Sequence, residues 1–382
     1  MVSTSYSQNN SCSFLYFTSI RNDTKTGHSQ ASLGHHSHPR RPGAQRIEAA
    51  SVDGWTVVVR FDEGDQGLCF EIDSLLPGSG PRWADMAPSR EPGADGPAPD
   101  MRIKTRRIRG VFSQGLLIPL SEFPEIVAAV QALARGVAPS ELDAKLRETS
   151  FEELLRVRKF ESPDGSESST DGVTPLPDFP FFIPRTDQER VQNMPDVFYS
   201  HRDAVFQEST KMDGSSVTVF YFCRDSPHYN LLDPEILASG PDSLGCVGST
   251  VRKLDLSATL AKIGRNIAIQ AELCGSSIQA NYEGFPPGTH SLLLYAVWDI
   301  DAQRYLPPRE VRETWASRLG VPHVPVHGYR PLREMGACVA DLVARAEGKG
   351  VNGRKREGIV LKQEDAPFGF KAISNSYLVR HG

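Results

Sequence analysis

The sequence has 382 residues, more than a single hydrophobic core usually holds, so we expect two domains with additional tails. Hydrophobic residues make up 39% of the chain, and 42 basic and 47 acidic side chains give a formal net charge of −5. This near balance neither indicates nor excludes a nucleic-acid partner, because binding depends on local clusters of charge. The six cysteines form no CxxC pair, which argues against a structural zinc site or a disulfide scaffold and favours a reducing compartment.

The amino-terminal segment, residues 1–45, is rich in Ser, Thr, Asn, Gln and His, and Asp23 is its one acidic residue. Two interpretations stay open: a disordered tail, or a targeting segment, since transit peptides are rich in Ser and Arg and poor in acids. We therefore predict a cytoplasmic or mitochondrial protein. The longest apolar run, near residues 292–300, is far shorter than the ~20 residues of a membrane span, so we expect a soluble protein without a membrane partner.

Residues 46–121 contain several short predicted strands. Residues 50–61 indicate two strands joined by a turn, residues 67–75 indicate a third, and residues 101–120 supply more. Short strands without a long helix are typical of a small β-barrel, and the OB type is the first choice.

Three cations alternate near the end of this region, at Arg102, Lys104 and Arg106. Alternate residues of a strand point to the same face, so the pattern predicts a positively charged strand face that binds the phosphate backbone of a nucleic acid. The alternative is a solvated edge strand whose charges prevent aggregation.

A helical segment and a linker are expected at residues 122–180. Apolar residues recur at helical spacing in residues 122–134, and a second amphipathic pattern covers residues 139–155. Residues 161–178 are polar, acidic and contain prolines, which is typical of a linker. We place the domain boundary there and expect a second domain at residues 181–382.

The second domain contains the pattern Lys211-Met212-Asp213-Gly214, directly ahead of a β-branched and aromatic run that predicts a strand. A lysine is a nucleophile only when its amine is uncharged, and its reference pKa is about 10.4. Burial or a neighbouring cation must therefore lower the pKa of Lys211. The glycine permits close approach of a ligand to the backbone, and the acid can orient a ligand or a metal ion.

Further candidate residues follow along the chain. Glu272 is expected at the end of a strand, and Trp298 interrupts the apolar strand of residues 292–300. Glu357 opens a later predicted strand, and Lys371 lies in the last one.

The order of these motifs resembles that of the covalent nucleotidyltransferase superfamily, which contains ATP-dependent DNA and RNA ligases and mRNA capping enzymes. More closely, the chain resembles the Deinococcus-type RNA ligases, which carry an N-terminal OB module, over about residues 46–378. The resemblance implies an α+β fold with an N-terminal OB-like β-barrel, followed by a two-sheet, ATP-grasp-like nucleotidyltransferase domain. The matching segments are residues 46–55, 71–77, 109–120, 185–193, 270–281 and 371–378.

The resemblance also implies roles for single residues. Lys211 matches the lysine that attacks ATP and becomes lysyl-AMP, Glu272 matches the acid that binds the ribose, and Trp298 matches an aromatic residue against adenine. Glu357 matches an acid that helps to hold the metal ion, and Lys371 matches a lysine that contacts the phosphate.

Other members of the nucleotide site are implied in the same way. Asp213 and Gly214 shape the pocket, and Lys362 ends the motif that Glu357 opens. The family places an arginine between the first lysine and the ribose-binding acid. Arg252 is the first choice for this arginine, and Arg224 is the alternative.

The implied function is ATP-dependent sealing of RNA 3′-hydroxyl and 5′-phosphate ends through lysyl-AMP, with Mg²⁺ or Mn²⁺ as the metal ion. The implied partner is RNA or an RNA-containing duplex, and we expect a monomer. Two alternatives stay open: a capping guanylyltransferase or DNA ligase of the same superfamily, or a nucleic-acid-binding protein without catalytic activity.

Overall fold

The computed structural model divides the chain into two compact units. The amino-terminal unit consists of Asn9–Pro163 with Leu378–Gly382, and the carboxy-terminal unit consists of Met1–Gln8 with Asp164–Tyr377. The finer domain limits at residues 45, 121 and 180 stay predictions. The residues that the structure describes are 2–3, 15–21, 31–34, 48–52, 54–59, 66–78, 82–83, 99–138, 141–142, 145, 149–160, 180–194, 196–222 and 245–381.

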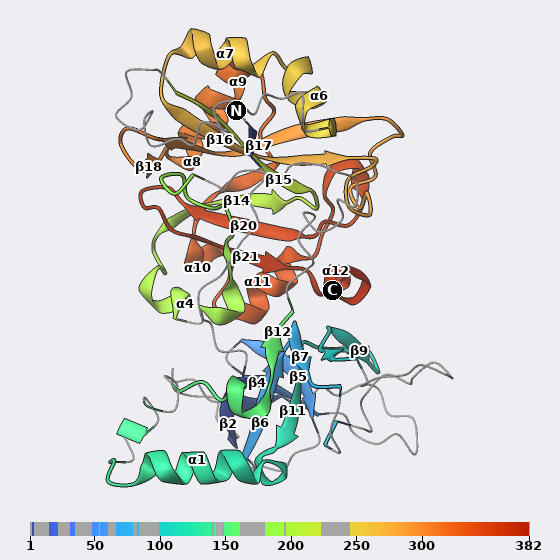
Figure 1. The fold of residues 1–382 in the computed structure, drawn as a ribbon, viewed down its shortest axis with the longest axis vertical. Coiled ribbons are helices and arrows are strands. Elements are labelled where there is room, and N and C mark those ends of the chain that lie inside the picture. Colours follow the sequence, from blue (N-terminus) through green and yellow to red (C-terminus); the bar gives the residue numbers. More distant parts are fainter. Residues whose placement is uncertain are drawn as a thin grey trace. The chain divides into compact units, whose positions relative to one another are not determined.

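The amino-terminal unit is built on a six-stranded sheet with the strand order β11-β6-β2-β3-β4-β5, a three-stranded sheet with the order β12-β7-β8, and the hairpin of β9 and β10 (Figure 1). The strands are β2 Leu15–Arg21, β3 Ala31–Gly34, β4 Glu48–Val52, β5 Trp55–Val59, β6 Gln66–Glu71, β7 Ser74–Leu76, β8 Met101–Arg102, β9 Arg106–Ile108, β10 Val111–Ser113, β11 Gly115–Pro119 and β12 Arg158–Lys159.

The six-stranded sheet is open in its strand pairing, which corrects the expectation of a closed barrel. Its edge strand β5 is nevertheless bonded to the residues just ahead of the other edge strand, β11, because Gln114 N donates to Thr56 O at 2.6 Å and Val58 N donates to Ser113 Oγ at 3.0 Å. Two strands of the sheet, β2 and β3, lie within residues 1–45. A part of the segment that we expected to be a tail is therefore strand.

The helices of this unit pack on an apolar core. The core includes Leu68, Phe70, Trp83, Phe123 and Ile126. α1 (Pro124–Ala134) begins with proline at its first position, where no intrahelical hydrogen bond is lost. This confirms the first predicted helix; the described parts of the second are residues 141–142, 145 and α3 (Glu152–Leu155), and the 3₁₀ helix η1 spans Leu120–Glu122.

The carboxy-terminal unit contains two five-stranded sheets, with the orders β1-β15-β16-β17-β18 and β13-β21-β20-β14-β19. We call them the upper and lower sheet, after their places in Figure 1. The strands are β1 Val2–Ser3, β13 Glu189–Arg190, β14 Val205–Lys211, β15 Ser215–Tyr221, β16 Ile267–Gly275, β17 His290–Asp299, β18 Arg304–Tyr305, β19 Val326–Pro331, β20 Gly358–Gln363 and β21 Gly369–Ile373.

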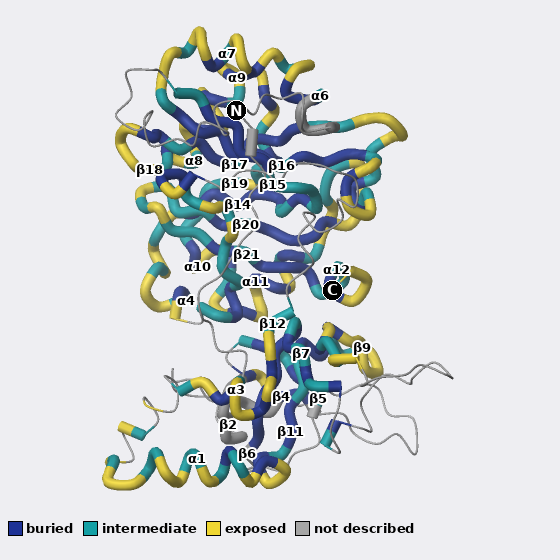
Figure 2. Tube along the Cα trace, viewed as in Figure 1, coloured by how far each residue is buried: buried dark blue, intermediate teal, exposed yellow. Residues whose placement is uncertain are grey.

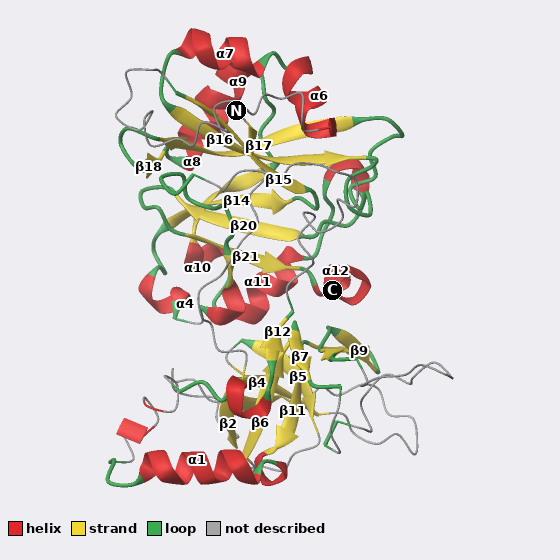
Figure 3. Cartoon of the chain, viewed as in Figure 1, coloured by secondary structure: helices red, strands yellow, loops and turns green. Residues whose placement is uncertain are grey.

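Helices cover the outer faces of both sheets, so that the inner faces look toward each other (Figure 3). α6, α7 and α9 lie over the upper sheet, and α4, α10 and α11 lie under the lower sheet. Their bounds are α4 Val197–Ser200, α6 Gly245–Lys253, α7 Leu256–Ile263, α8 Pro308–Glu310, α9 Ala316–Leu319, α10 Leu332–Met335, α11 Val339–Ala346 and α12 Asn375–His381, with short helices η2 Val191–Asn193, η5 Val311–Trp315 and η6 Val351–Gly353.

Each sheet has its own apolar core beneath these helices, and its strands are mostly buried (Figure 2). In β15, Val217 and Val219 face the upper core together with Leu256 and Leu260 of α7. The alternate residue Ser216 lines a cavity on the inner face. No described helix has the length and apolar character needed to cross a membrane.

Candidate active site

The turn after Lys211 connects the two sheets. Lys211 ends β14 of the lower sheet, where it pairs with Gly358 of β20, and β15 of the upper sheet begins at Ser215. Met212 is buried in a cluster with Cys274, Leu293 and Val324. The side chain before the turn is therefore fixed at the junction of the sheets.

Gly214 is required in this turn because β16 passes very close to it. A Cβ atom at this position would lie 2.5 Å from Leu273 O and 2.8 Å from Glu272 Cγ. The close approach is therefore between two strands of the protein. It brings the turn after Lys211 against the strand that carries Glu272. Glu272 itself lies inside β16, three residues before the strand end, where we had expected it at the end.

A cavity of about 480 Å³ opens between the sheets at this junction. Five of the predicted site residues line it: Lys211, Gly214, Glu272, Lys362 and Lys371. Its other lining residues include Arg185, Thr186, Asp187, Gln188, Ser209, Thr210, Met212, Ser216, Gln279, Tyr295, Val324 and Val360.

Lys211 forms an ion pair with Glu357. Its Nζ lies 2.6 Å from Glu357 Oε1, and the Lys211 side chain is a quarter exposed, while that of Glu357 is almost fully buried. Burial favours the neutral amine, but the carboxylates of Glu357, Glu272 and Asp213 outweigh burial and raise the pKa of Lys211. Because its pKa is raised, Lys211 is in its charged form in the free protein. This is the opposite of the lowered pKa that we expected from the sequence.

The pKa values of three acids around Lys211 are raised above the usual value of a carboxyl group. Burial raises the pKa of Glu272 to about 8, against the attraction of Lys211. Burial also raises the pKa of Glu357, and it raises that of Glu283 to about 7. Burial is thus the main cause of the raised pKa values of these acids.

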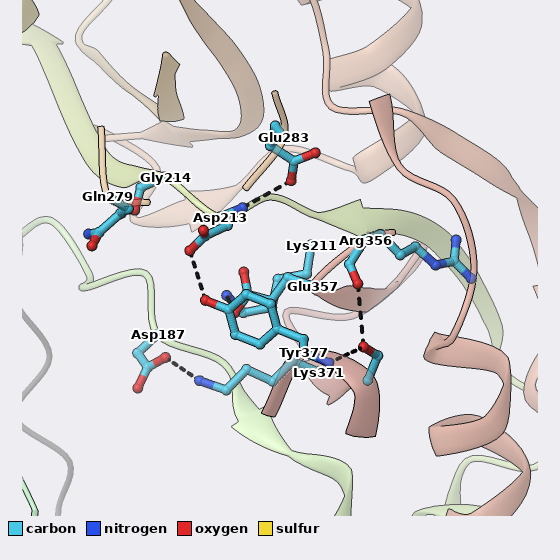
Figure 4. A network of polar contacts seen from close by, with 11 residues as sticks. Asp187, Lys211, Asp213, Gly214, Gln279, Glu283, Arg356, Glu357, Lys371 and Tyr377 are labelled. Carbon is cyan, nitrogen blue, oxygen red and sulfur yellow. Dashed lines mark hydrogen bonds and ion pairs between the residues drawn. The ribbon is translucent and has the colours of Figure 1, made fainter. Parts of the chain in front are cut away.

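Asp213 is held from two sides (Figure 4). Its backbone N donates to Glu283 Oε1 at 3.2 Å, and its Oδ1 accepts a hydrogen bond of 2.8 Å from the Tyr377 hydroxyl. Asp213 contacts the site from behind Lys211 and is not among the described residues that line the cavity.

Two further lysines reach the cavity from the lower sheet. Lys371 Nζ donates to Asp187 Oδ1 at 2.7 Å (Figure 4), and Lys362 Nζ donates to Tyr295 O at 2.7 Å. Burial lowers the pKa of Lys371, and it lowers that of Lys362 to about 7. Both amines lie where they can meet the charge of a phosphate group.

The acids fit a divalent cation. Glu357 Oε2 and Glu283 Oε2 are buried, and neither has a hydrogen-bond partner among the described residues. Carboxylate oxygens are the ligands that Mg²⁺ and Mn²⁺ prefer. Within the described part of the chain, no group of three or more His, Cys, Asp or Glu side chains forms a metal site by itself. This fits a cation that is held by one or two carboxylates and by the phosphates of a substrate.

Two predicted nucleotide-binding residues lie elsewhere. Trp298 packs with Phe182 and Tyr305, donates to Phe182 O at 3.1 Å, and is absent from the described lining of the cavity. The structure does not bring Trp298 into this cavity, and its stacking on adenine stays a prediction. Arg252 is exposed on α6, which covers the outer face of the upper sheet, away from the cavity. Its alternative, Arg224, lies outside the described residues.

The three alternating cations do not form one strand. β8 ends at Arg102 and β9 begins at Arg106, although Lys104 and Arg106 do point outward as predicted. Arg102 pairs with Asp73 at 2.6 Å and stacks at 3.9 Å over the ring of Phe160. Arg102 thus serves the packing of its own unit, and the other two cations are exposed.

The sequence matches two family models in the order of the two units. An OB-fold domain model matches residues 36–120, and an RNA ligase model matches residues 204–374. No curated protein sequence matches the chain significantly.

Solved structures of the RNA ligase of Naegleria gruberi are similar over nearly the whole chain. The form with PPi is 29% identical over 97% of this chain and 99% of that chain, with a TM-score of 0.66. A glutamate-to-alanine variant with AMP and Mn is 31% identical over 89% of this chain and 95% of that chain, with a TM-score of 0.65. A lysine-to-alanine variant with ATP and Mn is 30% identical over 92% and 98%, with a TM-score of 0.65.

The chain belongs to the RNA ligase family. The predicted combination of an OB-fold domain and a nucleotidyltransferase domain is confirmed, and so is the prediction of a phosphodiester-forming enzyme.

Sequence reasoning missed several residues of this RNA ligase site. Tyr295, Arg185 and Asp187 line the cavity, and Glu283 and Tyr377 contact Asp213. Arg185, Asp187 and Tyr377 do lie in segments that match the resembled family, residues 185–193 and 371–378, and Tyr295 lies in the same predicted strand as Trp298. A β-bulge opposite Gln270 and Ala271 leaves Tyr295 as the extra residue of β17, which no periodic pattern indicates.

Proposed function

We propose that Lys211 is the nucleophile with which this RNA ligase joins 3′-hydroxyl and 5′-phosphate ends of RNA at the expense of ATP. The observation that carries this proposal is the Lys211–Glu357 ion pair of 2.6 Å in the wall of a cavity that Glu272, Lys362 and Lys371 also line. A lysine surrounded by acids and facing two further amines suits transfer of a phosphoryl group, which depends on positioning and on neutralisation of charge.

The lining suggests an orientation for ATP. Lys371, Lys362 and Arg185 supply positive charge to the phosphates, and Glu272 can accept hydrogen bonds from the ribose. Tyr295 and Val360, rather than Trp298, supply the apolar surface for adenine. The α-phosphate then faces Lys211.

The spacing of the site residues supports these roles. Glu272, Glu357 and Lys371 follow one another at separations of 85 and 14 positions, and Asp213 follows Lys211 by two. In the Naegleria gruberi ligase, the residues replaced in the solved variants include a lysine with an aspartate two positions later, and two glutamates and a lysine at the same separations of 85 and 14.

The reaction runs in three balanced steps. The Lys211 nitrogen loses its proton to solvent and attacks the α-phosphorus of ATP; an N–P bond forms, the bond to the bridging oxygen breaks, and pyrophosphate leaves. A 5′-phosphate oxygen of RNA then attacks the adenylate phosphorus; a P–O–P bond forms, the N–P bond breaks, and the Lys211 nitrogen takes up a proton. Finally, the 3′-hydroxyl oxygen attacks the 5′-phosphorus after losing its proton, which forms the phosphodiester and releases AMP.

The residues of the chain prepare the first step. Glu357 holds the charged Lys211 beside the cavity, and the charge of Asp213 favours the same protonated form, so that the lysine is already oriented when ATP arrives. Glu357 and Glu283 would hold a Mg²⁺ or Mn²⁺ ion through their unpartnered oxygens. When bound, such an ion supplies positive charge that neutralises phosphate charge and lowers the pKa of a neighbouring amine.

RNA binding is assigned to the exposed cations of the OB-fold domain and to the nucleotidyltransferase domain. Lys104 and Arg106 would contact the phosphate backbone, while Arg102 is engaged with Asp73. We further propose that the protein acts as a monomer on RNA or on RNA-containing duplexes, in the cytoplasm or in mitochondria.

The test is incubation with ATP labelled on the α-phosphate and Mg²⁺, followed by denaturing electrophoresis. We expect an acid-labile protein–AMP adduct with the wild type and none with Lys211→Ala. The absence of an adduct with the wild type, or an equal adduct with Lys211→Ala, would overturn the proposal. Parallel reactions with GTP, and sealing of RNA nicks compared with DNA nicks, separate an RNA ligase from a capping enzyme or a DNA ligase.

A further inference from the structure

The first turn of α12 connects three parts of the site that come from distant points of the sequence. Ser374 N donates to Glu357 O at 2.8 Å, and Ser374 Oγ donates to Arg356 O at 3.4 Å. Tyr377 N donates to Ser374 Oγ at 3.1 Å. The start of the helix, directly after the strand that carries Lys371, is thus tied to Arg356 and Glu357, the two residues just before β20.

From this anchored turn, Tyr377 reaches the turn that follows Lys211. Its hydroxyl donates to Asp213 Oδ1 at 2.8 Å (Figure 4). The ring is fixed by an edge-to-face contact with Tyr282, at 5.0 Å between centroids and 86° between planes. Burial, together with the neighbouring acids, raises the pKa of Tyr377, so the hydroxyl keeps the proton that it donates.

Asp213 has few other restraints. Its backbone N donates to Glu283 Oε1, and Asn352 Nδ2 in turn donates to Glu283 O at 3.2 Å. In the described residues, the Tyr377 hydroxyl is the one side-chain group seen to hold the Asp213 carboxylate. Without it, the carboxylate could turn toward Lys211, and the two-residue link between Asp213 and Lys211 would loosen the placement of the amine.

We propose that Tyr377 is a positioning residue for the adenylate-transfer step: through Asp213 it fixes the turn that aims the Lys211 amine at the α-phosphate. The inference rests on the proposed function of Lys211. Tyr377 lies beyond residues 204–374, the part that the RNA ligase model matches, and it does not line the described cavity. It acts on the lysine only, so it should affect the steps in which Lys211 reacts and spare the joining of ends that are already adenylated.

The experiment compares two reactions in Tyr377→Phe, which keeps the ring and removes only the hydroxyl. One is single-turnover formation of protein–AMP from ATP and Mg²⁺, and the other is sealing of a nick with a pre-adenylated 5′ end. We expect the first rate to fall about tenfold at saturating ATP, with the KM for ATP and the second rate within about twofold of wild type. Tyr199→Phe is the matched control, because Tyr199 is 91% exposed; both of its rates should match wild type.

Each outcome decides the inference. An adduct rate equal to wild type overturns it, and so does an equal loss in both reactions, which would assign Tyr377 to fold stability alone. A second measurement uses the Asp213→Ala background: if Tyr377 acts through Asp213, adding Tyr377→Phe causes no further loss, whereas an additional tenfold loss contradicts the proposal. A wild type that forms no adduct would instead refute the proposed function, so the two failures are distinguishable.

Discussion

Lys211 Nζ and Glu357 Oε1 lie 2.6 Å apart at the junction of two sheets, one at the end of β14 and the other just before β20. The two strands pair directly, so that Lys211 is opposite Gly358. A backbone ladder thus holds Lys211, and Glu357 lies directly beside this ladder. Rigid placement of this kind lowers the entropy that must be lost when ATP is attacked.

Replacing Glu272 with glutamine should stabilise the protein while it abolishes adenylation. Burial raises the pKa of Glu272 to about 8 in the folded protein, against a usual value of 4.5. The folded state therefore binds the proton more tightly than the unfolded state, and stability falls as pH rises from about 4.5 to 8. We expect Glu272→Gln to raise the melting temperature by a few degrees at pH 8 and to leave it nearly unchanged at pH 4.5. A lower melting temperature at pH 8 would contradict this assignment.

Replacing Gly214 with alanine should disturb the turn after Lys211, because the new Cβ would lie 2.5 Å from Leu273 O. We expect a fall of about 10²-fold in the rate of adduct formation, together with a loss of about 1–3 kcal/mol in the free energy of unfolding. Gly288→Ala is the control for a glycine replacement without a steric clash: its φ is positive, at +76°, unlike that of Gly214, and no atom lies within 4 Å of the added Cβ. It should cost about 1 kcal/mol and keep the adduct rate. Equal effects of the two substitutions on the adduct rate would contradict the role of the close approach between Gly214 and β16.

Separate replacements of Tyr295 and Trp298, the two aromatic residues of β17, should distinguish their roles. Tyr295 lines the cavity, whereas Trp298 packs against the segment at Phe182. Tyr295→Ala should raise the KM for ATP about tenfold, since stacking on a base is worth about 1–3 kcal/mol. Trp298→Phe should leave this KM unchanged and lower stability. The measurement is adduct formation over a range of ATP concentrations, and a raised KM in Trp298→Phe would support the sequence prediction.

Neutralising the exposed cations of the OB-fold domain should weaken RNA binding in a salt-dependent way. For Lys104→Ala or Arg106→Ala, we expect the slope of log K against log salt to become shallower by almost one unit each, because one phosphate contact is lost. Arg102→Ala should instead lower stability, since it removes the pair with Asp73 and the contact with Phe160. Titration of labelled RNA at several salt concentrations and melting curves distinguish the two behaviours. An unchanged slope in Lys104→Ala and Arg106→Ala would remove both from the RNA-binding surface.

Buried polar residues of β14 illustrate what no sequence pattern indicates. Glu208 lies three residues before Lys211, is 2% exposed, and forms two hydrogen bonds of 2.8 Å with Arg345 of α11. Local sequence suggests a charged residue on a strand edge, but the strand is central in the lower sheet. Only a helix that packs beneath the sheet can supply the partner, because a buried carboxylate without one would be very costly.

The sequence by itself determined the order of the two domains, the short strands of the first, the nucleophile Lys211 as a hypothesis, and the set of Glu272, Glu357, Lys362 and Lys371. The strands follow from local periodicity, and the site residues follow from the resemblance of their ordered motifs to a known family. Tertiary structure alone decided that Tyr295 rather than Trp298 lines the cavity, that Arg102 is used within its own domain, and that Tyr377 holds Asp213. The physical reason is that a bulge, an ion pair across strands and a hydrogen bond from a later helix depend on how distant segments pack, and packing leaves no period in the sequence.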